Sequence, residues 1–249
     1  MKKKLSRNQT FLLITIPVLL LFFCFNTLPL IKGFMYSFTN FKGFGSYDIV
    51  GLRNYIDLFT DARVGKSYLF TFKFAILATI ITNIIALILA LGLNSKIKAK
   101  STLRGIYFVP RILGGLVVGY IFGYIFTYIL PAVTGTSSML SSTNTAWIAI
   151  VIVASWQAIA QTTLIYISGL QTVPEDVYEA GAIDGATGWK SFKSLTLPLI
   201  IPFLSINMVL SMKDFLMVFD QIMALTKGGP AQSTESISYL IYSNGIGGG

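Results

Sequence analysis

The candidate chemistry of this sequence lies in charged and polar side chains that interrupt long apolar segments. Lys213, Asp214 and Asp220 sit in or beside one such segment, where each charge at mid-membrane costs at least about 2.5–3.5 kcal/mol. The two aspartates are six residues apart and point to different faces of a helix, a poor arrangement for paired acid–base carboxylates. The chain has no histidine and one cysteine, Cys24, which lies in an apolar run. The sequence therefore predicts neither a catalytic centre nor a metal site.

Uncharged polar residues in the apolar segments suggest a different role, which is to line a path for a polar solute. Gln157 and Gln161 are four residues apart and share a helix face. Inside a membrane such side chains either hydrogen-bond to other helices or face water. Tyr120 and Tyr124 lie deeper than Tyr128, an expected interfacial residue, and could face a polar path. The predicted path residues are Tyr120, Tyr124, Gln157, Gln161 and Asn207.

The segment 170–202 is the one place where acidic residues gather closely. Pro174 suits the first position of a helix, and Glu175 and Asp176 follow in the first turn, where the helix dipole favours negative charge. Small residues between 180 and 188 let another protein approach the backbone closely. We therefore predict a short helix, a glycine-rich turn and a second short helix that together dock another protein beside the membrane.

Composition places these residues in an integral membrane protein. The 249 residues are 54% hydrophobic and 12% charged, whereas a soluble domain has about a quarter charged residues. Several segments reach the roughly 20 apolar residues that a membrane-spanning helix needs. The net charge of +9 lies mostly beside these segments, which favours contacts with the lipid bilayer over nucleic-acid binding. The expected spans are 11–31, 74–93, 110–130, 146–168 and 195–219.

Basic residues set the expected orientation of the spans. The first eight residues carry four basic side chains, and the connection 94–105 carries four more and no acid. Both are therefore predicted to be cytoplasmic, with the N-terminus inside. The expected plan is a cytoplasmic N-terminus (1–10), a first span (11–31), an external connection (32–73), a transmembrane core (74–225, including the loop 170–198) and an external C-terminal segment (226–249).

Three further features bear on how the spans pack. Gly115, Gly119 and Gly123 form the small-xxx-small pattern that lets helices approach closely in lipid. Arg111 is expected to reach back to the membrane surface from the inner end of its span. Lys213 has no acidic partner at its own helical neighbour positions. Either the embedded helix ends just before it, or Lys213 faces a cavity or another subunit.

The loop at 170–198 resembles the coupling motif of ABC importer permeases, which reads Glu-Ala-Ala, three residues, Gly, nine residues, Ile-x-Leu-Pro. The matching residues here, at the same spacing, are Glu179, Ala180, Gly181, Gly185, Leu195, Leu197 and Pro198. Gly181 replaces the second alanine of the motif, and Leu195 replaces the isoleucine. Further stretches are similar to the carbohydrate-uptake branch of the family, of the maltose and glycerol-phosphate type, and to the first permease of the pair. They are 50–63, 108–110, 183–186 and 218–234.

The resemblance implies an all-α, polytopic permease of a bacterial cytoplasmic membrane that pairs with a second permease as a heterodimer. It implies two ATPase subunits that use ATP and Mg, no cofactor on this chain, and an extracellular binding protein that delivers a sugar or oligosaccharide. Family members usually have six spans, so a further helix is expected after 226–249. The residues implied to contact the ATPase are Glu179, Ala180, Gly181, Asp184, Gly185 and Ala186.

Two other classes of protein fit the sequence less well. A secondary transporter or channel for small polar solutes would need ionisable residues in the membrane for ion coupling, and the candidates all lie late in one span. A membrane-embedded enzyme would need a Ser or Asp constellation that the spacing does not supply. Neither class accounts for the loop at 170–202.

Overall fold

The computed structural model describes residues 7–94, 105 and 108–245, with side chains from residue 11 onward. Its regular elements are helices, and the described residues contain no strand beyond one isolated bridge between Thr39 and Ile49. Five helical stretches are long and apolar enough to cross a membrane, which confirms the all-α polytopic class and the number of predicted spans. They are Phe11–Tyr36, Ala62–Asn94, Gly115–Thr134, Ala146–Gln171 and Gly188–Leu216.

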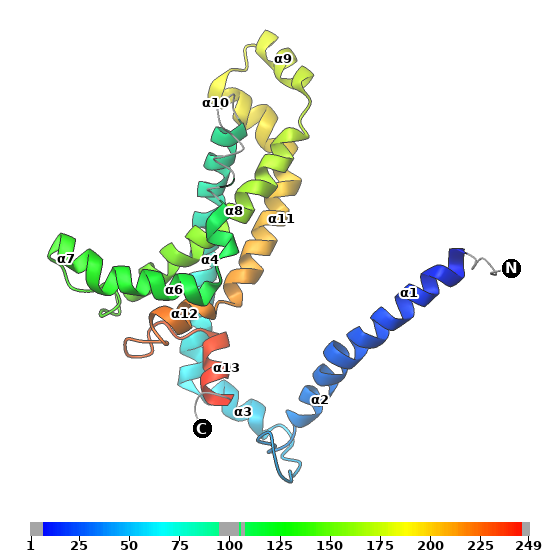
Figure 1. Cartoon of the computed structure of the whole chain (residues 1–249), viewed down its shortest axis with the longest axis vertical. Coiled ribbons are helices and arrows are strands. Elements are labelled where there is room, and N and C mark those ends of the chain that lie inside the picture. The colour runs from blue at the N-terminus through cyan, green and yellow to red at the C-terminus, as the bar shows by residue number, and fades with distance from the viewer. Residues whose placement is uncertain (1–6, 95–104, 106–107, 246–249) are drawn as a thin grey trace. The chain divides into compact units, whose positions relative to one another are not determined.

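Figure 1 labels the helices in chain order. They are α1 (Arg7–Phe22), α2 (Leu28–Tyr36), α3 (Arg53–Thr60), α4 (Ala62–Asn94), α6 (Gly115–Tyr124), α7 (Leu130–Thr134), α8 (Ala146–Gln171), α9 (Glu175–Ile183), α10 (Gly188–Ser191), α11 (Leu197–Leu216), α12 (Asp220–Leu225) and α13 (Ile237–Gly245). Short π-helical segments join neighbouring helices into the longer spans, at Phe23–Thr27, Ile125–Ile129 and Phe192–Thr196.

The third and fifth spans are bounded by changes in the backbone that the apolar pattern did not reveal. Gly114 is extended, with φ −61° and ψ 143°, and caps α6, so this span begins at Gly115, later than predicted. Helix α11 continues to Leu216 and therefore contains Lys213. The lysine lines an apolar groove between α4 and α11, and where the membrane-embedded part of this helix ends stays a prediction. Asp220 lies outside the span, as the first residue of α12.

The chain forms two compact units, Met1–Ala62 and Arg63–Gly249. Within the first, an aromatic cluster follows α2, where the rings of Tyr36 and Phe41 stack with their centroids 4.3 Å apart. The connection predicted at 32–73 is thus ordered up to residue 62 within the first unit, whereas residues 63–73 form the beginning of α4 in the second unit.

The basic connection 94–105, on which the predicted orientation depends, lies almost wholly outside the described residues, as does most of 1–10. The orientation of the spans therefore stays a prediction.

Helices α4, α8 and α11 form the core of the second unit and lie side by side in Figure 1. Small residues allow this close packing, because helix association in lipid depends on backbone approach more than on the hydrophobic effect. A Cβ added to Gly169 of α8 would lie 2.6 Å from the ring of Phe203 on α11. Helix α4 contributes a row of fully buried alanines, which are Ala75, Ala78, Ala86 and Ala90.

A buried polar network connects these three helices. The Tyr166 hydroxyl donates to Oδ1 of Asn83 at 2.8 Å, and Nδ2 of Asn83 donates to Oγ of Ser211 at 3.3 Å. Nδ2 of Asn207 donates to the carbonyl of Thr162 at 3.1 Å. The polar groups thus pair between helices, since an apolar medium offers them no other partner.

The glycine stripe of α6 receives α12, which confirms the predicted close approach. A Cβ on Gly115 would lie 2.6 Å from Oδ2 of Asp220, and one on Gly119 would overlap the Cβ of Ala224. Gly123 faces the same short helix. Helix α12 therefore folds back along α6 and brings Asp220 to the beginning of that span.

We expect Tyr166→Phe to destabilise the bundle, because Oδ1 of Asn83 would lose its donor in a dry environment. The loss should be about 0.6–1.7 kcal/mol, as for hydrogen bonds between membrane helices. Unfolding by SDS in mixed micelles measures it. The matched control is Tyr128→Phe, since the Tyr128 side chain is exposed. Equal stability of the two variants would show that the network contributes nothing.

Candidate functional site

The segment 170–202 folds as the predicted helix, turn and helix. Glu175 and Asp176 open α9. The predicted first position of Pro174 is wrong by one residue, because its extended backbone (φ −61°, ψ 143°) makes it the N-cap residue. The second helix begins at Gly188 and runs through α10 directly into the fifth span. Figure 1 shows α9 and α10 at the shared end of α8 and α11, and α12 at the opposite end. The segment is therefore a compact projection from the bundle.

The turn between the two helices depends on glycine at a left-handed position. Gly185 has φ +74°, a conformation that side chains disfavour, and a Cβ there would meet nothing within 4 Å. The amide of Ala186 donates to the carbonyl of Gly181 at 2.8 Å and closes the turn. Gly181 is buried, because Cδ1 of Leu195 occupies the place that its Cβ would take. Glycine thus serves conformation at one position and packing at the other.

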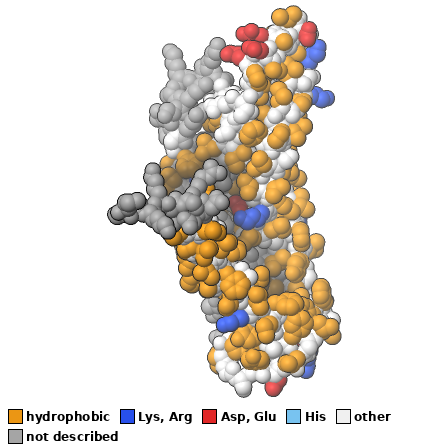
Figure 2. All heavy atoms as spheres, turned by 90° about the vertical axis from the view of Figure 1, so that its right-hand side faces the viewer, with side chains coloured by type: hydrophobic (Ala, Val, Ile, Leu, Met, Phe, Trp, Pro, Cys, Tyr) orange, Lys and Arg blue, Asp and Glu red, His pale blue; other side chains and the backbone are white. Residues whose placement is uncertain are grey.

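The predicted docking residues divide by exposure. Gly181 is buried and Ala186 partly buried, while the exposed members are Glu179, Ala180, Asp184 and Gly185. Two apolar side chains that the sequence analysis did not select are also exposed, Ile183 at 88% and Trp189 at 75%. Acidic and basic side chains gather at this end of the molecule, above a largely apolar surface (Figure 2).

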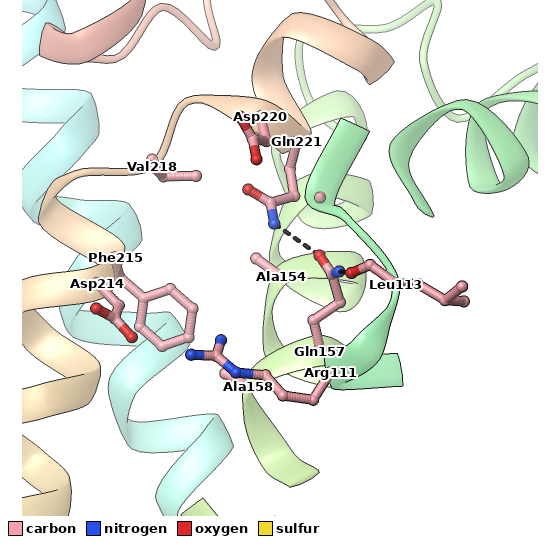
Figure 3. Close-up of a pocket in the computed structure, with 11 residues that line it drawn as sticks. Arg111, Leu113, Ala154, Gln157, Ala158, Asp214, Phe215, Val218, Asp220 and Gln221 are labelled. Carbon is pink, nitrogen blue, oxygen red and sulfur yellow. Dashed lines mark hydrogen bonds between the residues drawn. The ribbon is translucent and has the colours of Figure 1, made fainter. Parts of the chain in front are cut away.

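A cavity of about 300 Å³, here called the chamber, lies between the beginning of α6 and helices α8, α11 and α12. Figure 3 shows its side chains converging from these elements. Nε2 of Gln221 donates to Oε1 of Gln157 at 2.7 Å, and Nε2 of Gln157 donates to the Leu113 carbonyl at 3.3 Å. Its polar and aromatic lining consists of Arg111, Gln157, Asp214, Phe215, Asp220 and Gln221.

A second, narrow pocket adjoins the chamber and has a volume of about 20 Å³. Gln161 and Asn207 line it, together with Thr162 and Ser211. Because α8 and α11 carry both sets of lining residues at successive turns, the two spaces follow one another along these helices. The arrangement can bind a hydroxyl-rich solute through amides, hydroxyls and carboxylates, and it places Gln157 at the chamber and both Gln161 and Asn207 at the narrow pocket.

The other two predicted path residues lie elsewhere. Tyr120 and Tyr124 are 58% and 61% exposed on this chain and do not line the chamber or the narrow pocket. Their predicted role would need a surface from another subunit. Arg111, which the sequence analysis did not select for the path, lines both spaces. Arg111 could have been noticed in the sequence, since it is a lone cation at the start of an apolar run. The direction of its side chain, however, depends on the break in the helix at Gly114.

Among the described residues, no group of three or more His, Cys, Asp or Glu side chains is placed to hold a metal ion. The acidic members of the loop are spread along α9 and the turn, and the acids of the chamber are separated by Arg111 and the two glutamines.

Known proteins are similar in sequence to this chain over most of its length. Residues 82–246 match the family model of the binding-protein-dependent transport system inner membrane component. The chain is 39% identical over 242 residues to the multiple sugar-binding transport system permease protein MsmF of Streptococcus mutans, covering 94% of this chain and 82% of that protein. It is 36% identical over 240 residues to the trehalose/maltose transport system permease protein MalF of Thermococcus litoralis, covering 93% and 81%.

A solved structure shares the fold. A chain from the crystal structure of a bacterial ABC transporter involved in the import of the acidic polysaccharide alginate has a TM-score of 0.82 and 19% sequence identity. The match covers 98% of this chain and 86% of that chain. Fold, family model and relatives agree, and the chain belongs to the inner-membrane permease family of binding-protein-dependent ABC transporters.

Proposed function

We propose that this chain is a permease subunit that moves a sugar or oligosaccharide into a bacterial cell across the cytoplasmic membrane. An extracellular binding protein delivers the sugar, a second permease completes the path, and two cytoplasmic ATPase subunits use ATP and Mg. The proposal is supported by relatives whose names specify sugar transport, such as MsmF and MalF. In this arrangement the N-terminus and the loop 170–198 face the cytoplasm, where the basic connection 94–105 also belongs by its charge.

The exposed turn of the loop is the observation that carries the coupling role. Asp184 and Gly185 are exposed on this chain, and the apolar side chain of Ile183 is 88% exposed. Exposed apolar residues beside charged ones are typical of protein interfaces. The ATPase contacts proposed are Glu179, Ala180, Gly181, Asp184, Gly185 and Ala186. A rigid loop continuous with α8 and α11 would transmit movement of the ATPase to the helices that line the chamber.

The two departures from the coupling motif compensate one another. Gly181 stands where the motif has alanine, and Leu195 stands where it has isoleucine. Cδ1 of Leu195 fills the position that an alanine Cβ would take at 181. Leucine and isoleucine are isomers, so the pair here has one carbon fewer than the pair in the motif, and the Leu195 methyl group fills the space that the missing alanine methyl leaves. The filled space supports the view that this loop retains the coupling shape.

The chamber supports a sugar as the solute. Sugars present hydroxyl pairs and apolar ring faces, and the chamber offers amides, carboxylates and a guanidinium beside the ring of Phe215. Its volume of about 300 Å³ lies at the lower end of the range for small-molecule sites. The proposed path residues are Gln157, Gln161 and Asn207, with Tyr120 and Tyr124 contributing where another subunit faces them.

For coupling, we expect Gly185→Trp to lower binding-protein-stimulated ATP hydrolysis about ten-fold or more, because a bulky side chain at an interface centre prevents close docking. The assay uses proteoliposomes that contain this chain, its partner permease and the ATPase subunits. Gly135→Trp is the matched control, because Gly135 also has a positive φ (+68°) and open space but lies at the end of α7. Equal activity in the two variants would exclude docking at Gly185.

For the packing of the loop, we expect Gly181→Ala to lower stimulated ATP hydrolysis several-fold, because its methyl group overlaps Leu195. Adding Leu195→Val removes the overlapping atom and should restore most of the activity, since the two changes conserve volume. Leu195→Val alone is the control for lost packing. Strictly additive effects of the two substitutions would contradict the proposed compensation.

For the path, we expect Gln157→Ala and Gln161→Ala to raise the KM for sugar uptake about 2–10-fold, the loss that one hydrogen bond produces. Ser168→Ala on the same helix is the control, because Ser168 is exposed and bonds only to the Leu164 carbonyl. Tyr120→Phe tests the surface of α6 in the same assay. Unchanged uptake kinetics in both glutamine variants would exclude the chamber and the narrow pocket from the path.

A further inference from the structure

The chamber and the narrow pocket meet at three residues, and two of these carry opposite charges. Arg111, Ala158 and Asp214 line both spaces, and we call them the neck. On one side of the neck the volume is about 300 Å³, and on the other about 20 Å³. A bound water needs roughly 10–15 Å³ of such volume, so the narrow pocket has room for about one. A solute that leaves the chamber along α8 and α11 must therefore pass between Arg111 and Asp214.

The two charged side chains face each other across the neck without forming an ion pair. In Figure 3 the guanidinium of Arg111 extends toward Asp214 and the ring of Phe215. Over the part of the chain that the structure describes, Arg111 has no carboxylate oxygen within 4.0 Å, and Asp214 is paired with Lys213 at 4.0 Å. The Lys213 and Asp214 side chains are 66% and 50% exposed, so that pair is weak. Arg111 and Asp214 could therefore form an ion pair with each other if they approached.

The position of Arg111 is fixed by the break that precedes the third span. Arg111 lies in the helical stretch 108–112, and the extended backbone of Gly114 turns the chain into α6. The Leu113 carbonyl between them accepts a hydrogen bond from Gln157 of α8 at 3.3 Å. One hydrogen bond thus holds the arginine segment against α8, whereas Asp214 is carried by α11. The two charges belong to different elements, so a shift of either element changes their separation.

Electrostatics gives such a neck two favourable arrangements. Arg111 is exposed on this chain and Asp214 is half exposed, so solvent screens their attraction in this arrangement. Exclusion of water strengthens the attraction, and an unpaired charge is then tolerated only where a polar group solvates it. With the chamber open, water or sugar hydroxyls solvate both groups. With the chamber collapsed, pairing of Arg111 with Asp214 is the remaining way to satisfy them.

We propose that Arg111 and Asp214 form a charge-paired constriction, which closes the path when the chamber narrows and separates when a sugar passes between the two spaces. The inference rests on the proposed function. Arg111 donates to sugar hydroxyls and Asp214 accepts from them, so the solute replaces the bonds that the pair loses. While the chamber is narrow, the closed pair prevents small solutes from leaking through the permease.

Passive efflux of xylitol from proteoliposomes with the complete transporter, without ATP or binding protein, tests the constriction. Arg111→Gln and Asp214→Asn keep polar side chains but cannot form the ion pair. We expect each to raise xylitol efflux about five-fold or more, as the loss of a coupled charged pair implies. Exchanging the charges, with Arg111→Asp and Asp214→Arg together, should return efflux to near the unmodified rate. Co-purification of the ATPase subunits confirms that each variant assembles.

Lys213→Gln is the decisive control, because Lys213 is the other cation near Asp214 and lines a different groove. We expect efflux as low as in the unmodified transporter. The constriction is overturned if Lys213→Gln leaks as much as Asp214→Asn, if Arg111→Gln stays tight, or if the charge exchange leaks like the single variants. Failure of the proposed function has a separate signature, which is an unmodified transporter that shows no ATP-dependent sugar uptake.

Discussion

Lipid offers no hydrogen-bond partner to a polar side chain, and this constraint arranges the core of the second unit. Asn83 and Tyr166 can be buried within the bundle because each supplies the group that the other needs. Their pairing requires α4 and α8 to approach closely, and the buried alanines and Gly169 make that approach possible. The small residues allow the helices to approach closely, and the polar pairs form hydrogen bonds only at that close distance. The two features therefore depend on each other in this bundle.

The same closeness creates the chamber. Because the glycines of α6 accept α12 against the helix surface, the chain after α11 folds back and carries Asp220 and Gln221 to the beginning of α6. The break at Gly114 turns Arg111 toward the same place. The chamber is thus bounded by short segments that do not span the membrane, packed against spans that do. Short segments can shift without disrupting the core, which suits a space that must open and close.

The loop at the other end of α8 and α11 differs from the chamber, because it is packed tightly inside and exposed outside. Its internal contacts are tight, through Gly181 against Leu195 and the hydrogen bond that closes the turn, while Ile183, Asp184 and Gly185 are exposed on this chain. A loop that is rigid inside and open outside can transmit a push without deforming. Since it continues into α11, the proposed docking surface and the proposed constriction at Asp214 are connected by one helix.

Much of this protein was determined by local sequence. The number of spans follows from the length of the apolar segments. The helix and turn of the loop follow from Pro174 and the glycines after it, and the glycine stripe of α6 indicated that another helix packs closely there. These signals lie close together in the sequence, so they can be interpreted without the tertiary structure. The partner itself, α12, and the direction of Arg111 could not be predicted, since they depend on contacts between residues more than a hundred positions apart or on a single backbone break. Tyr120 and Gln157 looked equally suited to a polar path from depth and residue type. Only tertiary packing separated them, because the direction a side chain faces is set by the helices around it and not by its own sequence.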